Sequence, residues 1–422
     1  MKNTVLKFIY SILRRYARKV ILRHKPRVIA ITGSVGKTTT KEAIAQVMRD
    51  AFVNQVRATS GNLNAEIGIP LTILGYTKNP PKIAWPIILI SAWFRTFAKS
   101  YPKYLILEMG VEHPGDIEYF GSIVSPEVGV ITAATPAHLA NFKDLSEMQS
   151  EKIQMSQILK KNGLIIYNLD DEYLSKQKFD NSISYSIKNQ RSDCQADGEI
   201  LSENGMDYSI NYKDEKINLK SRLLGIHLIY ADLAAFCVGR HFGISSEKIV
   251  LSLEKRKPIA GRMNLINGRN GVKIIDDTYN SNPASACAAL DTLNDIKYSS
   301  GRKVAILGNM NELGSMEEES HIKVAEYARG KCDLIIFSGK NASIMRKAYG
   351  DKKTSLEFKN RFDIIKSLDK ILKPFDLVLI KASQNKNFFE EVTKQLLQNK
   401  EEAGNLLVRQ DKFWHKRKKD SH

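Results

Sequence analysis

Cysteine is scarce in this sequence: four occur in 422 residues, and they lie tens of residues apart. They are Cys194, Cys237, Cys287 and Cys332. None of them forms the CxxC pair that is typical of zinc sites and redox motifs, and no disulfide framework is indicated. We therefore expect a reduced, cytoplasmic protein.

Long hydrophobic runs are also missing. Charged residues interrupt every apolar stretch well before the roughly 20 residues that a transmembrane helix needs. The first helical stretch has no small-residue cleavage site, so we expect no signal peptide. Internal repeats and low-complexity tracts are absent, and the length favours two or three globular domains.

Acidic residues are absent from the first 27 residues, which carry nine lysines and arginines within a chain of formal charge +18. Such a segment favours polyanionic partners. Residues 1–25 predict a basic amphipathic helix with an apolar stripe at Val5, Ile9, Ile12, Tyr16 and Val20. Either residues 1–24 lie on an anionic membrane, peripheral to its inner face, or the stripe packs on the protein body. A second apolar stretch at residues 83–94 could share the membrane contact or be buried.

Strand-like apolar runs alternate with helical stretches along most of the chain. "RVIAIT", "YLILEMG", "VGVITAA" and "NGLIIYNLDD" predict strands, and "TTTKEAIAQVMRDAF" predicts a helix. Residues 182–223 predict a small antiparallel segment, and a helix follows that ends before Gly243. A second strand–helix series begins near residue 257, with helices expected at 283–295, 319–329 and 387–399.

This alternation predicts an α/β protein with mostly parallel sheets. We expect a central P-loop ATPase-like domain at residues 26–258 and a Rossmann-like C-terminal α/β domain at residues 259–400, followed by a basic tail at 401–422. Ligands of such sheets bind at the carboxyl ends of the strands.

The stretch "ITGSVGKTTTKEA" at residues 31–43 is typical of a phosphate-binding loop between a strand and a helix. Backbone N–H groups of residues 34–38 and the helix N-terminus can hold phosphate oxygens. Lys37 would neutralise phosphate charge, and the Thr38 hydroxyl would reach Mg²⁺. Only two residues separate Gly33 from Gly36, whereas the strict P-loop pattern has four between its glycines.

The shortened pattern Thr-Gly-x-x-Gly-Lys-Thr-Thr resembles the Mur ligase family, ATP-dependent enzymes that join amino acids or peptides to a carboxylate. "GNLNAEIGIPLTIL" resembles the family's substrate loop, and "LEMGVEHPGDI" and "ITAATPAHLANF" resemble its metal-site strands. "GRMNLINGRNGVKIIDDTYNSNPAS" and "AILGNMNELG" resemble its C-terminal domain. The resemblance covers residues 26 to 395, with the motifs in the family's order.

The resemblance implies a role for each matching residue. ATP would be bound by Gly33, Ser34, Val35, Gly36, Lys37, Thr38, Thr39, Arg262, Asp277, Tyr279 and Asn280. Two Mg²⁺ ions would be held by Thr38, Glu108, His138 and Lys152, the last carbamylated by CO₂. The substrates would contact Asn62, Asn64, Lys381 and Ser383. The catalytic residues would be Lys37, His138, Lys152 and Arg262.

Taken without the resemblance, several of these residues have ordinary structural interpretations. Glu108 ends a strand, where its carboxylate can bind Mg²⁺ as a hard oxygen ligand or bond to nearby backbone. By itself, His138 would be interpreted as a structural histidine, and Lys152 as a solvated lysine on a helix. Lys381 and Ser383 also suit an ordinary strand-to-helix turn.

The implied reaction is amide-bond formation in peptidoglycan precursor synthesis. The γ-phosphoryl group of ATP would pass to a carboxylate of a muramyl-peptide-like substrate, and the amine of an amino acid or a dipeptide such as D-Ala-D-Ala would attack the acyl phosphate. Closure of the two domains around ATP would exclude water. We expect a monomer.

Three alternatives remain open at the level of the sequence. The same chemistry could act on a lipid-linked or other non-UDP substrate at the membrane. The positive charge also suits a P-loop NTPase that binds nucleic acid, but no aromatic-interleaved basic groove is evident, and we expect no nucleic-acid partner. A non-catalytic relative is disfavoured by the intact motif residues.

Four features depart from the family pattern. About thirty residues precede the phosphate loop, where UDP-binding relatives carry a whole N-terminal domain. Leu228 and Ala231 stand where the family has asparagines near the adenine. Asn309 replaces an aspartate and Gln384 replaces an arginine, which leaves the identity of the amine substrate open.

Overall fold

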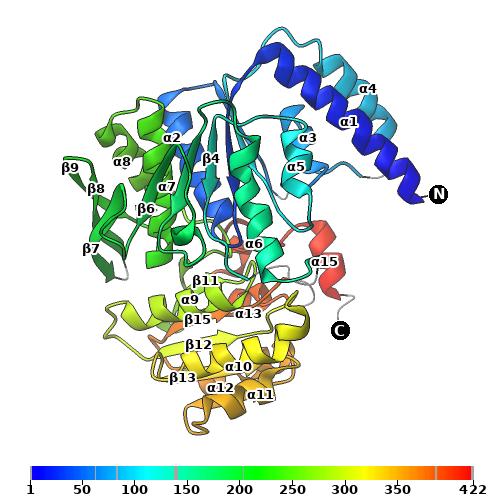
Figure 1. The fold of residues 1–422 in the computed structure, drawn as a ribbon. Coiled ribbons are helices and arrows are strands. Elements are labelled where there is room, and N and C mark those ends of the chain that lie inside the picture. Colours follow the sequence, from blue (N-terminus) through cyan, green and yellow to red (C-terminus); the bar gives the residue numbers. More distant parts are fainter. Residues whose placement is uncertain are drawn as a thin grey trace. The chain divides into compact units, whose positions relative to one another are not determined.

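The computed structural model describes residues 2–61, 63–81, 84–136, 141–202, 204–384 and 387–419 (Figure 1). They form two compact units, each built around its own sheet. The first unit comprises Met1–Asp197, Ser209–Leu219 and Leu228–Glu254, and the second comprises Gly198–Tyr208, Lys220–His227 and Lys255–His422. The predicted α/β class is confirmed.

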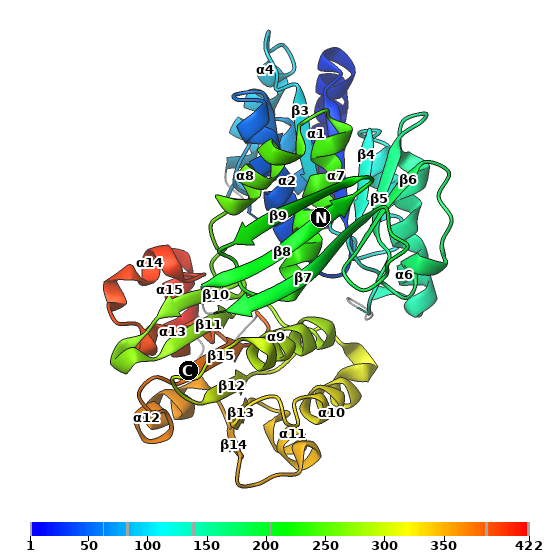
Figure 2. The same ribbon diagram turned by 90° about the vertical axis from the view of Figure 1, so that its left-hand side faces the viewer.

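The larger sheet has nine strands in the order β2-β3-β1-β4-β5-β6-β7-β8-β9, the last three of which lie side by side in Figure 2. The strands are β1 (Arg27–Thr32), β2 (Val56–Ala58), β3 (Tyr104–Glu108), β4 (Val128–Ile131), β5 (Leu164–Asn168), β6 (Ser182–Ser186), β7 (Cys194–Ser202), β8 (Gly205–Tyr212) and β9 (Glu215–Ser221). β1 pairs in parallel with both β3 and β4. Because the parallel strands run together, the ends of β1, β3 and β4 meet at one edge of the sheet.

The expectation of an antiparallel segment from residue 182 is wrong for its first strand. β6 pairs in parallel with β5 and with β7. The connection through the short helix η4 (Leu174–Lys176) returns the chain to the starting end of the sheet, so that β6 continues the parallel arrangement.

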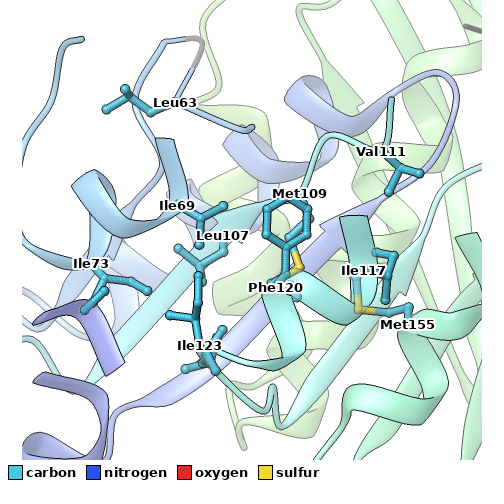
Figure 3. Close-up of a cluster of buried hydrophobic side chains, with 14 of the residues drawn as sticks. Leu63, Ile69, Ile73, Leu107, Met109, Val111, Ile117, Phe120, Ile123 and Met155 are labelled. Atoms are coloured by element: carbon cyan, nitrogen blue, oxygen red, sulfur yellow. The ribbon is translucent and has the colours of Figure 1, made fainter. Parts of the chain in front are cut away.

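Helices cover both faces of this sheet. On one face α2 (Lys37–Ala51), α7 (Ile229–His241) and α8 (Ser246–Glu254) pack together. The other face carries α1 (Lys2–His24), α3 (Gly68–Ile73), α4 (Trp85–Arg95), α5 (Asp116–Gly121), α6 (Leu145–Ile153) and η3 (Gln154–Ile158). The second group surrounds a buried core to which Leu107 of β3, Ile69 of α3 and Phe120 of α5 contribute (Figure 3).

The first helix packs on the protein body. Leu13, Ala17 and Val20 are fully buried in the same core, and α1 contacts α3 and α4. The buried face is turned slightly from the predicted stripe, because Ile12 and Tyr16 are only partly buried. The sequence left open whether this helix lies on a membrane or packs on the protein body, and the structure shows the packing. In the described part of the chain no helix combines the length and hydrophobicity needed to cross a bilayer.

The second unit has six strands in the order β10-β11-β15-β12-β13-β14. The strands are β10 (Asn264–Asn267), β11 (Lys273–Asp277), β12 (Lys303–Leu307), β13 (Leu334–Ser338), β14 (Ser355–Phe358) and β15 (Leu377–Lys381). Its longer helices are α9 (Pro283–Asp295), α10 (Glu317–Tyr327), α11 (Ala342–Tyr349), α12 (Arg361–Ile371) and α13 (Glu390–Leu396). The other helices are η5 (Ile226–Leu228), η6 (Arg269–Gly271), η7 (Gly314–Met316), η8 (Lys400–Glu402), α14 (Ala403–Leu406) and α15 (Lys412–Lys419).

All strand pairs of this sheet are parallel except β10 with β11. The register places Asp277, Lys381 and Leu307 side by side at the carboxyl ends of three adjacent strands. The polar residues that follow these strands therefore gather at one edge, as the sequence predicts.

The packing of α1 is open to a direct test. Leu13→Ala should lower the free energy of unfolding by about 3 kcal/mol, because it leaves a cavity in the core. Leu22→Ala on the same helix, where the side chain is 63% exposed, should change it by less than about 0.5 kcal/mol. Urea denaturation of both variants measures the difference, and equal effects would contradict the burial of this helix face.

Candidate active site

The turn between β1 and α2 has the backbone geometry of an anion-binding loop. Gly33 and Gly36 both have positive φ, +144° and +80°. At Gly33 an added Cβ would also overlap the Thr132 hydroxyl, so this position requires glycine for space as well as for conformation. α2 begins at Lys37 without a side-chain cap at Gly36. The N-terminus of the helix is therefore left for an anion.

The loop is fastened to the residues that follow β4. The Ser34 N–H donates to the Ala133 carbonyl at 2.8 Å, and the Thr132 hydroxyl donates to the Val35 carbonyl at 2.6 Å. This corrects part of the sequence prediction, because the N–H of Ser34 is used within the protein. The phosphate donors that remain are at the start of α2, where the N–H groups of the first turn have no carbonyl within the helix to pair with.

Lys37 lies folded over its own loop. Its amine donates to the carbonyls of Gly33, at 2.5 Å, and Ser34, at 3.4 Å. A lysine held this close to the loop can turn toward a bound phosphate with little movement of the backbone. Its position agrees with the role that the motif predicts.

Glu108, at the end of β3, is the carboxylate nearest this loop in the sheet, because it pairs with Ile31 in the parallel register. Its side chain is 2% exposed. The Thr38 hydroxyl donates to its Oε1 at 2.9 Å, and the Asn64 amide donates to the same oxygen at 3.1 Å. The Thr59 hydroxyl accepts from the Glu108 backbone N–H at 3.0 Å and fixes the strand end.

The second carboxylate oxygen of Glu108 suits a cation. Oε2 is buried and has no hydrogen-bond partner among the described residues, although the amine of buried Lys41 lies 3.9 Å away. A buried carboxylate oxygen without a donor is costly. Together with the Thr38 hydroxyl it offers hard oxygen ligands of the kind that Mg²⁺ prefers. The described residues contain no group of three or more His, Cys, Asp or Glu side chains that could hold a metal.

Lys152 is buried at the C-terminal end of α6, with 1% of its side chain exposed. Burial, and to a smaller extent the nearby Lys37 charge, lower the pKa of its amine to about 7, although Glu151 and Asp116 oppose the shift. A substantial fraction of the amine is therefore neutral near pH 7. The sequence interpretation of Lys152 as a solvated lysine is wrong.

Glu151 explains how Lys152 is held in place, and the sequence analysis missed it. Its carboxylate accepts from the Gly115 N–H at 3.0 Å and from the Ile117 N–H at 2.9 Å. It thus caps the N-terminus of α5 and ties α6 to that helix. No local pattern marks this partner, because the two helices are about thirty residues apart in the sequence.

Two predicted residues, His138 and Asn62, lie outside the described residues. Asn64 is described, and its side-chain amide is directed to Glu108. In this arrangement Asn64 positions the carboxylate, and its predicted contact with substrate stays a prediction.

In the second unit the predicted residues Asp277 and Lys381 form a buried ion pair of 2.6 Å. The Lys381 amine also donates to the Asn280 carbonyl at 3.0 Å. The Ser383 hydroxyl is buried too and donates to the Ser281 carbonyl at 2.7 Å. These contacts favour the structural interpretation of Lys381 and Ser383, whose polar atoms are engaged within the unit.

Arg262 and Tyr279 are brought together in the second unit. The Arg262 guanidinium lies 4.3 Å from the centre of the Tyr279 ring, and Arg409 lies 5.5 Å from the same ring. Arg409 also donates to the Thr278 carbonyl at 3.2 Å and pairs with the buried Glu390 at 3.3 Å. Arg409 was missed, since it belongs to a stretch that the sequence analysis described only as a basic tail.

Comparison with known proteins gives matches over most of the chain. The sequence model of the Mur ligase middle domain matches residues 31–85 and 87–239, and that of the Mur ligase glutamate ligase domain matches residues 261–384. The chain is similar to UDP-N-acetylmuramoyl-tripeptide–D-alanyl-D-alanine ligase of Buchnera aphidicola subsp. Baizongia pistaciae, with 32% identity over 89% of this chain and 76% of that protein. The Bacillus subtilis ligase of the same name is 27% identical over 92% of this chain and 79% of its own length.

Solved structures give the same result. The MurF ligase from Thermotoga maritima in complex with ADP is 25% identical, with a TM-score of 0.78 over 94% of this chain and 84% of that chain. MurF from Acinetobacter baumannii, at 23% identity and a TM-score of 0.77, shares the fold over 92% of this chain and 80% of its own. The motifs quoted above resemble this ligase in particular.

The buried amine of Lys152 makes stability depend on pH. Since its pKa is lowered from 10.5 to about 7, the cost of burying it is fully present below about pH 7 and disappears as the pH rises toward 10.5. In metal-free buffer depleted of CO₂, Lys152→Met should raise the free energy of unfolding by about 2 kcal/mol at about pH 6 and by clearly less at about pH 9.5. Urea denaturation at both pH values measures this, and a difference independent of pH would contradict it.

Proposed function

The chain belongs to the Mur ligase family of ATP-dependent ligases, and from this membership we propose that it joins D-alanyl-D-alanine to a muramyl tripeptide. The family's enzymes form amide bonds, and the chain is a ligase of peptidoglycan synthesis. The choice of substrates rests on the relatives that are named for this reaction.

The observation that carries the proposal is the meeting of phosphate-binding and metal-binding groups at one edge of the larger sheet. The uncapped start of α2, Lys37 and the Thr38 hydroxyl lie at the end of β1, and Glu108 lies at the adjacent end of β3. ATP use is supported by the Thermotoga maritima neighbour, whose structure contains ADP. In this proposal residues 26–258 form the ATP-binding domain, and residues 259–400 form the C-terminal ligase domain.

The side chains of the first unit suit the two demands of phosphoryl transfer, which are positioning and charge stabilisation. The helix start and Lys37 would bind the phosphate oxygens of ATP and hold the transferring group. Thr38 and the Glu108 oxygen without a hydrogen-bond donor would hold Mg²⁺, which neutralises charge on the phosphates when bound. The carboxylate of the acceptor would take the phosphoryl group, and the amine would then displace phosphate.

Lys152 has the properties that a carbamylated lysine requires. CO₂ reacts with a neutral amine, and burial supplies that state near pH 7. The carbamate would be an anionic oxygen ligand for a second Mg²⁺, while Glu151 would keep the lysine in place from the end of α5. The metal role of His138 and the nucleotide roles of Arg262, Asp277, Tyr279 and Asn280 remain predictions.

Two residues of the second unit bear on the amine substrate. Asn309 stands where the family has aspartate and Gln384 where it has arginine, and both are described in the second unit. The Asn311 amide donates to the Gln384 carbonyl at 2.7 Å, so this strand-to-helix turn is held by uncharged groups. An assay with a panel of dipeptides and amino acids is therefore part of the test.

The proposed reaction predicts that phosphate release from ATP needs both an acceptor and an amine. Lys37→Ala should lower turnover at least about a thousandfold, because the positive charge that stabilises the transferring phosphoryl group is removed. Phosphate release and amide product are measured with UDP-linked muramyl tripeptide and D-Ala-D-Ala. Lys176→Ala, an exposed lysine in the same unit, serves as the control. Turnover by Lys37→Ala, or turnover without an acceptor, would contradict the proposal.

The Glu108 oxygen that lacks a hydrogen-bond donor predicts that loss of its charge weakens the use of Mg²⁺. Glu108→Gln keeps the shape and the bond to Thr38 but removes the anionic charge, so the Mg²⁺ concentration for half-maximal turnover should rise at least about tenfold. A Mg²⁺ titration of turnover measures this effect. The same Mg²⁺ requirement in both proteins would show that Glu108 is not a ligand.

A further inference from the structure

The helix α4 has an apolar surface on both of its faces. Its inner side packs on the core through Trp85, Ile88, Leu89 and Ala92. Its outer side, with the residues just after it, exposes Ile87, Ile90, Trp93, Phe94 and Phe97, whose exposed fractions are 71%, 60%, 44%, 62% and 46%. We call these five residues the α4 patch. A helix with apolar residues on both faces is ordinarily buried on both, so the α4 patch is a surface that no helix or strand of the described residues covers.

The α4 patch is contiguous. The Trp93 ring lies 4.9 Å from the Phe94 ring and 5.1 Å from the Phe97 ring, both edge to face. Ile87, Ile90 and Phe94 follow at helical spacing on the same side of α4. Apolar residues scattered singly on a surface need no explanation, but a continuous aromatic and aliphatic face marks an interaction site.

Cations surround this surface. α1 packs beside α4, as Figure 1 shows, and the Lys19 amine lies 4.5 Å over the Phe97 ring. The Arg23 guanidinium donates to the Thr96 carbonyl at 3.1 Å. Neither residues 1–41 nor residues 67–107 contain an aspartate or glutamate; between these stretches lie Glu42, Asp50 and Glu66, and Glu66 lies near Tyr10. The apolar patch is therefore bordered by positive charge.

We propose that the α4 patch inserts into the interface of an anionic membrane, with the cations of α1 on the lipid headgroups. An apolar helix face that carries Trp and Phe beside lysines and arginines has the composition of helices that lie in the membrane interface. The eleven residues of α4 are too few to span a bilayer, which takes about 20, so the helix lies along the surface. The proposed membrane contact is therefore made by α4 and not by the stripe of α1, whose Ile9 and Val20 are buried in the core.

A second copy of the chain suits this surface less well. A symmetric dimer through the α4 patch would bring the cationic α1 helices of two copies toward each other, and residues 1–41 carry no aspartate or glutamate to pair with those cations. Like charges in an interface oppose association, whereas anionic headgroups neutralise them. The charge pattern thus selects a lipid surface.

The membrane proposal goes beyond the proposed ligase function and can be tested separately from it. The full chain is sedimented with vesicles of phosphatidylcholine and with vesicles that contain about one third phosphatidylglycerol, in about 0.15 M salt. We expect binding to the anionic vesicles that weakens as salt is raised, and at least about tenfold weaker binding to phosphatidylcholine alone.

Two double variants separate the apolar and the charged contributions. Ile90→Ser with Phe94→Ser should weaken partitioning at least about tenfold, because it removes apolar side chains that would enter the interface. Its matched control is Ile200→Ser with Leu251→Ser, two exposed positions elsewhere. Arg15→Gln with Lys19→Gln should weaken binding to anionic vesicles about tenfold or more, and Lys352→Gln with Lys353→Gln is its control of equal charge.

All four variants change exposed residues, so their unfolding temperatures and their turnover on soluble substrates should equal those of the parent chain. The proposal is overturned if the parent chain does not bind anionic vesicles, or if the α4 variant binds as its control does. A concentration-dependent dimer that the α4 variant abolishes, without vesicle binding, would identify a second copy as the occupant. None of these outcomes bears on the ligase reaction, which is measured with soluble substrates.

Discussion

The close contact between the phosphate loop and the residues after β4 is the constraint on which the rest of the site depends. Gly33 lies so near Thr132 that no side chain fits between them, and the Ser34 N–H and the Val35 carbonyl are both bonded to residues of that segment. The segment is held in turn by Asp171, whose carboxylate accepts from the Ala134 N–H at 2.8 Å. The turn is fixed before any phosphate arrives, so its donors need little reorganisation to bind an anion.

The same parallel sheet places charge around this turn. The register sets Glu108 against Ile31, and the carboxylate then meets the first turn of α2 through Thr38. Four lysines are buried among the described residues, and three of them have carboxylates near their amines. Lys381 pairs with Asp277, Lys418 pairs with Glu390 and Glu391, and Lys41 lies near Glu42 and Glu108. Lys152 differs, because neighbouring Glu151 is engaged with the end of α5 and burial dominates its pKa. A lysine left in this state is expensive to bury, and a modification that turns it into an anion beside a cation would remove the cost.

Sequence alone could predict the parts of this arrangement that are local. The residues of the phosphate loop are contiguous in the sequence, and Glu108 can be recognised because it ends an apolar strand. The contact of Asn64 with Glu108, and that of Glu151 with the start of α5, could not be predicted, because each joins segments that are distant in sequence. The parallel β6 was missed for the same reason, since polar and apolar alternation does not fix the direction of pairing. The burial of Lys381 could not be predicted either. The motif marks this residue as a substrate contact, whereas in the fold it is buried and pairs with Asp277.

The two helices at the side of the first unit show where amphipathic patterns fail as predictors. In α1 the apolar residues cover a broad sector, and small Ala17 lies at the centre of contact, so the stripe read from large side chains is displaced from the buried face. In α4 only Ser91 and Arg95 are polar, so the sequence could not tell which of the apolar faces would be covered. In the structure the side of α4 that carries Ala92 is buried in the core, whereas the side that carries Ile90 is exposed, and α4 contacts α1. Because α1 packs beside α4 and keeps cations at the surface, the apolar and the cationic parts of the proposed membrane contact come from different helices, joined where the Lys19 amine lies over the Phe97 ring.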